Sequence, residues 1–225
     1  MKNSLLFIII TSLSQIVMGQ VHEIGVSFGG SNYVGDIGNN YFIYPNKPAG
    51  ALFYKFNWNP RVALRGTYSF LPIEGDDAKA DTNFRNIRNI NFSNTIHELA
   101  VGIEYNFYEY DVSSSDKSWT PYILLELAGY NYTNVTSHSS TGSPIFGNKS
   151  SIALPLGIGF KSKLYRKLAF AIETKFRYTF VDDLDFVNNS TPNVNVEGTG
   201  NDWYMFTGFS LIYTFGRPAC YKDGF

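Results

Sequence analysis

The chain has 225 residues, of which 16% are charged, and its formal net charge is −1. This balance argues against nucleic acid as a partner, because proteins that bind nucleic acid present a strongly basic surface. Aromatic residues make up 17% of the chain, with 19 Phe and 16 Tyr, but beyond the N-terminal segment no apolar run approaches the ~20 residues of a membrane helix. Such a composition is typical of strands with one apolar and one polar face.

The N-terminal segment has the pattern of an export signal. Lys2 precedes an apolar run from Leu5 to Ile10, and the small Gly19 stands before Gln20 with Val17 in the −3 position of a cleavage site. The run is too short for a retained membrane anchor. We therefore expect a signal peptide at residues 1–19, a single β-barrel domain at residues 20–215 and a C-terminal tail at residues 216–225.

Eight segments alternate between apolar and polar residues with a period of two. In segment 98–107, for example, Leu99, Val101 and Ile103 share one face while Glu104 lies on the other. A period of two predicts a strand, and a bulge is expected at Pro155, which cannot donate a ladder hydrogen bond. The eight predicted strands are Glu23–Tyr33, Ala49–Phe56, Arg61–Phe70, Glu98–Phe107, Trp119–Tyr132, Ser151–Lys161, Leu168–Phe180 and Trp203–Phe215.

The connections between these strands alternate between long and short. Four long stretches, rich in Asn, Gly, Asp and Ser, follow the odd-numbered strands, and three shorter ones follow the even-numbered strands. In lipid every backbone polar group must be paired, so spanning strands must close into a ring. The pattern predicts an all-β fold, an eight-stranded antiparallel transmembrane β-barrel with long extracellular loops and short periplasmic turns, located in the outer membrane with both termini in the periplasm. The long connections are 35–47, 72–91, 133–150 and 182–201, and the short ones are 57–60, 108–118 and 162–166.

The charged side chains of the strands all share the polar face. If the apolar face meets lipid, the charges point inward, and a barrel of about eight strands is just wide enough for side chains to fill it. We interpret the interior as a paired ionic plug, with a narrow pore as the alternative. A soluble lipocalin-like barrel, with the charges outside, is the alternative fold. The inward set is Glu23, Lys55, Arg61, Arg65, Glu98, Glu104, Glu126, Lys161, Glu173, Lys175 and Arg177.

Candidate catalytic and metal-binding residues are few. Thr95 and His97 share the lipid-facing side of one strand, so an enzyme acting on outer-leaflet lipid is an alternative function, but no carboxylate of the same parity follows to orient the imidazole. Two acidic clusters, Asp76/Asp77/Asp81 and Asp182/Asp183/Asp185, contain ligand types that suit a divalent cation, although solvated loop charge is the better explanation. A surface adhesin or small pore that uses the long loops is a further alternative. We predict no enzymatic activity, no metal and no cofactor.

The tail after the last strand holds the only cysteine, Cys220. An unpaired cysteine in an exported protein indicates an intermolecular disulfide or a free thiol. Barrel closure requires none of the residues after Phe215. We therefore expect the tail Gly216–Phe225 to dock on a periplasmic partner.

Three stretches of the sequence resemble the PorG-like outer-membrane barrels of Bacteroidota. These are the start Glu23–Asp36, the run Arg85–Glu98 that leads to Gly102–Phe107, and the ending Tyr213–Tyr221 with its Phe-Gly-Arg-Pro-Ala-Cys motif. The resemblance implies an accessory part of the type IX secretion and gliding apparatus, above a periplasmic ring made of a lipoprotein (PorK- or GldK-like) and its companion (PorN- or GldN-like). It also implies a set of partner-binding residues in the tail, namely Arg217, Pro218, Cys220 and Tyr221.

Overall fold

The computed structural model describes residues 21–39, 41–111, 118–138, 144–186 and 200–216. The expected signal peptide at 1–19 lies outside these residues. So do the four predicted partner-binding residues of the tail, Arg217, Pro218, Cys220 and Tyr221. Among the described residues, no helix is both long enough and apolar enough to cross a membrane.

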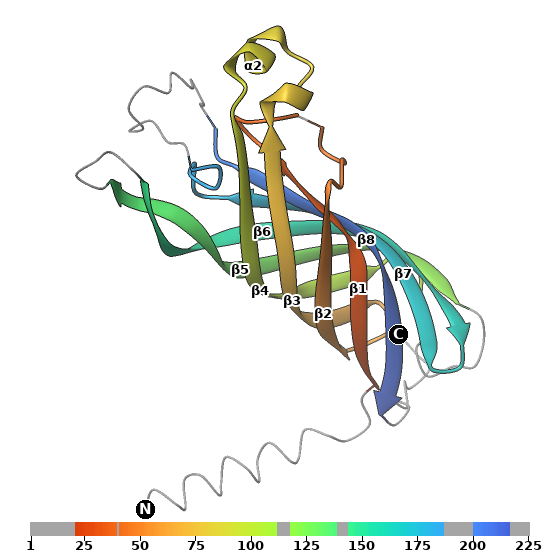
Figure 1. The fold of residues 1–225 in the computed structure, drawn as a ribbon. Coiled ribbons are helices and arrows are strands. Elements are labelled where there is room, and N and C mark those ends of the chain that lie inside the picture. The colour runs from red at the N-terminus through yellow and green to blue at the C-terminus, as the bar shows by residue number, and fades with distance from the viewer. Residues whose placement is uncertain (1–20, 40, 112–117, 139–143, 187–199, 217–225) are drawn as a thin grey trace, which may run out of the picture.

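Eight antiparallel strands form a closed ring in which each strand pairs with its neighbours in sequence and β8 pairs back to β1 (Figure 1). The predicted strand number and antiparallel barrel are confirmed. The strands are β1 Val21–Val34, β2 Lys47–Asn57, β3 Val62–Asp76, β4 Asn91–Asn106, β5 Trp119–His138, β6 Pro144–Tyr165, β7 Leu168–Thr179 and β8 Trp203–Gly216.

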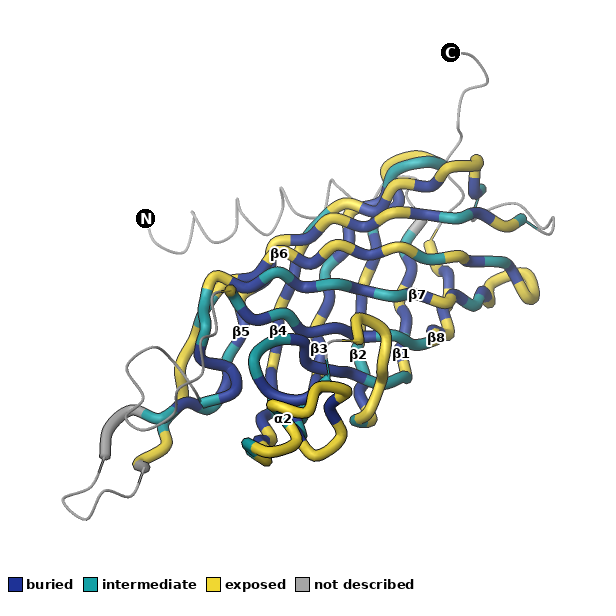
Figure 2. The backbone as a smooth tube through the Cα atoms, turned by 90° about the horizontal axis from the view of Figure 1, so that it is seen from above, coloured by how far each residue is buried: buried dark blue, intermediate teal, exposed yellow. Residues whose placement is uncertain are grey.

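Burial alternates along the strands as the period of two requires (Figure 2). In β4, Leu99, Val101 and Ile103 are exposed on the outside, whereas Glu98 and Glu104 are fully buried inside the ring. The lipocalin-like alternative is therefore wrong, because that fold would place the apolar side chains inside and the charges in solvent.

The two ends of the barrel differ, and we name them by their connections. The turn end holds the short connections 58–61 and 166–167, the ends of β2, β4, β6 and β8 and the starts of β1, β3, β5 and β7. The loop end holds residues 35–39, 41–46 and 77–90, the ends of β1, β3, β5 and β7 and the starts of β2, β4, β6 and β8. The connection from β3 to β4 contains the short helices η2 Asp77–Lys79 and α2 Asn83–Arg88, which lie above the ring (Figure 1).

Two sequence predictions about strand shape are wrong. The stretch 133–150 was expected to be a loop, but β5 and β6 pair out to His138 and Pro144 and project beyond the ring as a two-stranded ribbon (Figure 1). Pro155 pairs with Arg177 without any shift of register. The irregularities of β6 lie instead opposite Val135–Ser137 and at Lys163–Tyr165.

Candidate functional site

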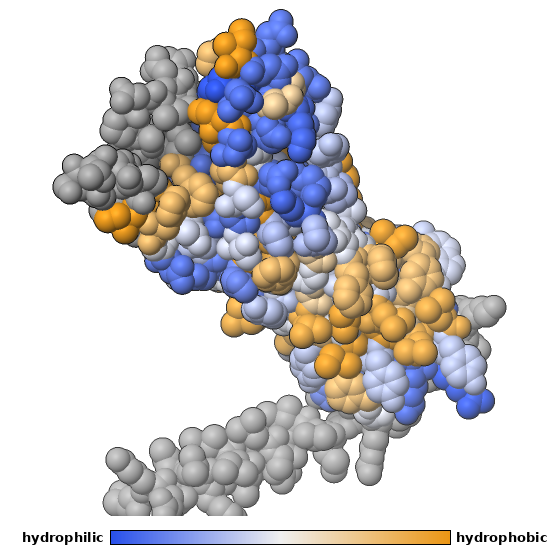
Figure 3. All heavy atoms as spheres, viewed as in Figure 1, coloured by the Kyte–Doolittle hydropathy of each residue, from blue (hydrophilic) through white to orange (hydrophobic). Residues whose placement is uncertain are grey.

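The outside of the ring carries a broad apolar belt. Figure 3 shows the apolar side chains gathered over the part of the barrel near the turn end, with mostly polar side chains over the loop end. An exposed apolar surface of this extent is unfavourable in water and fits the hydrocarbon core of a bilayer. The members of the belt include Ile24, Phe28, Leu52, Leu99, Val101, Ile103, Ile123, Leu125, Leu127, Ile152, Leu156, Ile158, Ile172, Phe209 and Leu211, each more than 45% exposed.

The interior of the ring is filled by a connected network of charged side chains. The carboxylate of Glu104 lies 2.6 Å from the Nζ of Lys55 and 2.5 Å from the Nζ of Lys161. Arg65 lies 3.4 Å from the same carboxylate, and its guanidinium donates two hydrogen bonds to Glu173, at 2.6 and 3.3 Å. Because a buried charge is costly unless it is paired, this arrangement holds the opposite walls of the barrel together.

The network continues toward the loop end. Lys175 lies 3.6 Å from Glu173 and 2.8 Å from Glu126, and Arg177 donates to both oxygens of Glu98, with a shortest distance of 2.9 Å. Ten of the eleven predicted inward charges are at most 3% exposed, five of them basic and five acidic. The balanced and buried interior supports the predicted plug over the narrow-pore alternative.

Arg61 is the exception among the predicted inward charges. It precedes β3, its side chain is 43% exposed, and it contacts Glu109 at 3.2 Å while donating to the carbonyl of Phe107 at 2.7 Å. The prediction for Arg61 was wrong because the strand pattern was extended one residue into a turn. In a turn, an odd or even position no longer determines which way a side chain points.

The turn end is closed by the beginning of the connection from β4 to β5. The Tyr110 ring is buried, its backbone N–H donates to the carbonyl of Pro60 at 3.1 Å, and the Nζ of Lys161 lies 4.6 Å from its centroid. Beside it, the fully buried carboxylate of Glu23 makes no hydrogen bond within the described residues, but it lies directly opposite Lys55 in the ladder from β1 to β2. The cation of Lys55 on the neighbouring strand offsets the cost of burying the Glu23 carboxylate.

At the loop end, the connections are fastened to one another through Asp77. Arg88 donates to both oxygens of this carboxylate, at 2.6 and 2.9 Å, and the backbone N–H groups of Gly38 and Ile90 donate at 2.9 and 3.2 Å. Burial opposes ionisation of Asp77, but these donors outweigh burial and hold its pKa below the ordinary value. Gly38 adopts a φ of 88°, a conformation that favours glycine, at the point where it meets Asp77.

A second group of hydrogen bonds joins strand β1 to the connection between β7 and β8. The hydroxyl oxygen of Tyr33 lies 2.9 Å from Asp185 Oδ2 and 2.5 Å from Asp202 Oδ1. A hydroxyl carries one proton, so one of these two contacts needs a proton on the carboxyl group. Burial and the nearby charge of Asp185 raise the pKa of Asp202 to about 8, so Asp202 supplies that proton at neutral pH.

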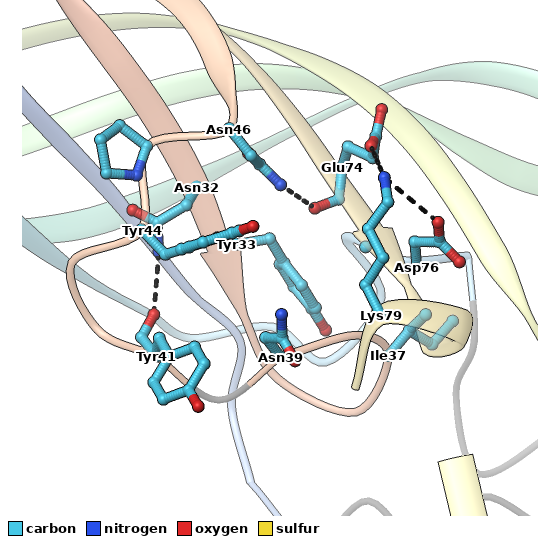
Figure 4. Close-up of a pocket in the computed structure, with 12 residues that line it drawn as sticks. Asn32, Tyr33, Ile37, Asn39, Tyr41, Tyr44, Asn46, Glu74, Asp76 and Lys79 are labelled. Carbon is cyan, nitrogen blue, oxygen red and sulfur yellow. Dashed lines mark hydrogen bonds and ion pairs between the residues drawn. The ribbon is translucent and has the colours of Figure 1, made fainter. Parts of the chain in front are cut away.

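A cavity of about 350 Å³ opens between the connection from β1 to β2 and the end of β3 (Figure 4). Asn32 in its wall is 2% exposed; its Nδ2 donates to the carbonyls of Tyr41 and Phe42, while its Oδ1 has no hydrogen-bond partner within the described residues. The cavity is lined by Asn32, Tyr33, Ile37, Asn39, Tyr41, Tyr44, Pro45, Asn46, Glu74, Gly75, Asp76 and Lys79.

On the lipid-facing side, His97 is hydrogen-bonded to a residue other than Thr95. His97 Nδ1 lies 2.9 Å from the hydroxyl of Tyr68, and the centroid of its ring lies 5.3 Å from that of Phe70. Thr95 lies opposite Pro72 in the ladder from β3 to β4. Within the described residues, the imidazole of His97 is therefore hydrogen-bonded to Tyr68, and no hydrogen bond joins it to Thr95.

The two predicted acidic clusters are separated into pairs with other groups. Asp76 caps η2, and Asp81 accepts a hydrogen bond from Tyr41. Asp183 accepts from Tyr132 and Asn134, each at 2.5 Å, and pairs with Lys149. In the part of the chain that the structure describes, no group of three or more His, Cys, Asp or Glu side chains is arranged to hold a metal ion.

Sequence reasoning missed the residues that shape the loop end, above all Asn32, Tyr33 and Asp202. One signal was available, because Asn32 and Tyr33 continue the strand into polar residues where a purely lipid-facing strand would stay apolar. The sequence carries no sign that Asp202 meets Tyr33, because the two residues are 169 positions apart.

A closed ring of eight antiparallel strands with an apolar exterior and a charged interior defines the class of transmembrane β-barrels. The chain belongs to the family described as a domain of unknown function, DUF6089, which matches residues 2–223. A search of curated proteins finds no match.

Several solved structures share this general shape at low sequence identity. The attachment invasion locus protein Ail of Yersinia pestis is 14% identical, with a TM-score of 0.49 over 88% of this chain and 100% of that chain. The N-terminal β-barrel domain of Pseudomonas aeruginosa OprF is 16% identical, with a TM-score of 0.47 over 88% of this chain and 98% of that one. A major outer membrane protein of Thermus thermophilus is 12% identical, with a TM-score of 0.49 over 88% and 100% of the two chains.

Proposed function

We propose that this protein is a non-enzymatic outer-membrane barrel that anchors or positions a periplasmic ring assembly of the type IX secretion system. The observation that carries the proposal is the interior: balanced charges in direct contact fill the ring, so a role in transport through the barrel is disfavoured. A membrane barrel with a filled interior acts through the partners that bind at its two ends.

The turn end suits a docking platform when it faces the periplasm. The backbone of Tyr110 is tied to Pro60, Arg61 is tied to Phe107 and Glu109, and Lys163 donates to the carbonyl of Asp111 at 2.5 Å. These contacts fix a surface at the same end of the barrel as Gly216, the last described residue before the tail residues 217–225. The resemblance of the ending to PorG-like barrels supports a ring lipoprotein and its companion as the partners, with Arg217, Pro218, Cys220 and Tyr221 at the contact.

Location is tested first by fractionation of the producing cells. A heat-modifiable, β-rich band is expected in the outer-membrane fraction, because closed barrels migrate differently before and after boiling. Recovery of the protein in the soluble periplasm would refute the proposal.

Docking is tested by affinity purification of the full chain from solubilised membranes. The ring lipoprotein and its companion are expected to co-purify, and a variant that lacks residues 217–225 should lose them while keeping its heat-modifiable migration. Equal recovery with both proteins refutes docking through the tail, and absence of ring proteins from both refutes the anchoring role. On non-reducing gels, a higher-mass species that disappears in Cys220→Ser is expected if the contact includes a disulfide.

A further inference from the structure

We propose that a hydrogen-bonded cluster of Tyr33, Asp185 and Asp202 holds the segment 181–186 against the loop end of the barrel while it is protonated, and releases this segment in alkaline medium. We call these three residues the carboxyl cluster. The inference concerns the end of the barrel opposite the proposed docking surface, and it does not depend on the anchoring role. The carboxyl cluster is shielded from solvent, because its residues are 4%, 3% and 1% exposed.

The segment 181–186 is packed against several strands at the loop end. The carbonyl of Leu184 accepts a hydrogen bond from Asn94 of β4 at 2.9 Å. The side chain of Leu184 is fully buried in an apolar cluster that includes Ile37, from the connection between β1 and β2, and residues of β3 and β4. The carboxyl cluster joins the segment to β1, because Asp185 follows Leu184 and lies 2.9 Å from the hydroxyl of Tyr33. Loss of the carboxyl cluster would therefore free the segment from β1.

The hydrogen bonds of the carboxyl cluster need one proton more than Tyr33 supplies. The hydroxyl oxygen of Tyr33 accepts from the backbone N–H of Asp36 at 3.2 Å, and its single proton can face only one of the two carboxyl groups. The contacts with Asp202 Oδ1 at 2.5 Å and with Asp185 Oδ2 at 2.9 Å are both hydrogen bonds only if one carboxyl group is protonated. Without that proton, two buried negative charges would compete for one donor, which is unfavourable away from water.

The surroundings favour Asp202 as the group that carries the extra proton. The titratable groups that face Asp202 are Tyr33 of β1, Tyr130 and Tyr132 of β5, and Asp182 and Asp185 of its own connection. None of these groups carries a positive charge. Asp185, by contrast, also interacts electrostatically with the cation of Arg88 in α2, and a nearby opposite charge favours a carboxylate. Burial, followed by the charge of Asp185, raises the pKa of Asp202 to about 8.

Release of the segment follows when Asp202 loses its proton. In the open form Asp202 meets water, where its carboxyl group ionises near its ordinary pKa of 3.8. Between this value and about pH 8, the closed form therefore holds one proton more than the open form. Each rise of one pH unit in that interval favours opening ~tenfold. Above about pH 8 both forms are ionised, and opening should no longer depend on pH.

The test is hydrogen exchange of the full chain, refolded in nanodiscs with a metal chelator present, followed by NMR at single amides from about pH 5 to about pH 9. The reporter is the amide of Leu184, which donates to Asp202 Oδ2 at 2.9 Å. After correction for the intrinsic exchange rate, its protection should fall ~tenfold per pH unit up to about pH 8. The reference is the amide of Ile90, which donates to Asp77. Its protection should stay constant, because the pKa of Asp77 lies below the ordinary value and this carboxylate is ionised throughout the range.

Three variants separate the carboxyl cluster from a general loosening of the loop end. Asp202→Asn keeps a neutral donor and acceptor at this position and should abolish the fall of protection with pH. Asp185→Asn removes the neighbouring negative charge and should move the fall to lower pH. The matched control is Asp183→Asn in the same segment, where Asp183 accepts from Tyr132 and pairs with Lys149. This control should lower the protection of Leu184 but leave its fall with pH in place.

Retention of heat-modifiable migration establishes that each variant is folded at both ends of the pH range. The proposal is overturned if the protection of Leu184 does not fall with pH, or if Asp202→Asn shows the same fall as the unaltered chain. A parallel loss of protection at Ile90 would also overturn it, because the whole loop end would then loosen together. If Asp202→Asn does not fold, Asp185→Asn decides, and a fall at unchanged pH refutes the proposal. Loss of the fall in Asp183→Asn would show that a different carboxylate responds to pH.

Discussion

Replacing Glu104 with Gln should destabilise the barrel more than most single substitutions. The carboxylate of Glu104 meets three cations, Lys55 at 2.6 Å, Lys161 at 2.5 Å and Arg65 at 3.4 Å, and all four side chains are at most 1% exposed. Arg65 keeps Glu173 as a partner and Lys55 keeps Glu23 opposite it in the ladder, but both lysines lose the carboxylate that contacts them directly. Removing one partner of a buried ion pair typically costs ~3–5 kcal/mol, and we expect a loss in this range.

The assay is urea unfolding of the barrel in lipid vesicles, followed by tryptophan fluorescence. The matched control is Glu109→Gln, which breaks the pair with Arg61 at 3.2 Å, where the side chains are 43% and 72% exposed; such a pair contributes ~0–1 kcal/mol. Adding Lys161→Met to Glu104→Gln should recover part of the loss, because it removes one of the unneutralised cations. A loss for Glu104→Gln as small as that of the control would refute the view that the network is dry and structural.

Three further predictions concern conduction, pH and the loop end. In planar bilayers the purified protein should pass almost no current, and a steady ion-selective conductance would contradict the plug. Burial raises the pKa of Asp202 from its ordinary 3.8 to about 8, so the folded state binds the extra proton and stability should fall as pH rises across this interval. Asp202→Asn, which stays neutral, should flatten that fall in urea titrations between pH 5 and about pH 9, and an unchanged slope would contradict it. Gly38→Ala should increase hydrogen exchange of segment 35–39, because φ is 88° and the added Cβ would lie 2.9 Å from Asp76 N; unchanged exchange would show that the turn tolerates a side chain.

The period of two predicted the direction of almost every charged side chain of the strands, because this geometry is local and needs no knowledge of the partner strand. It did not predict which charges meet. Arg65 and Glu173 are 108 residues apart, and they come together only when the ring closes. The pairing of opposite charges across a barrel therefore depends on the number and stagger of strands, which the sequence pattern does not state.

The pattern also failed where the strands leave the apolar belt. Apolar and polar residues alternate because one face meets lipid, and the signal fades once both faces are in a polar environment. Residues 133–138 and 144–150 continue as strands but have no apolar face, so they looked like a loop. The cavity residues lie beyond the same limit, and nothing periodic marks Asn32, Tyr41 or Tyr44.

The loop end and the proposed docking surface lie at opposite ends of a charge-paired interior. Coupling between distant sites needs an element with two arrangements that both sites bias, and in the described residues the paths from Asn32 to Gly216 run along hydrogen-bonded strands. We therefore expect the two ends to act independently. Tyr44→Ala, a substitution at the loop end, should leave co-purification of the ring proteins unchanged. If this variant, still folded, lost the ring proteins, the barrel would have to transmit a change of shape between its ends, and the ionic interior could not be a fixed plug.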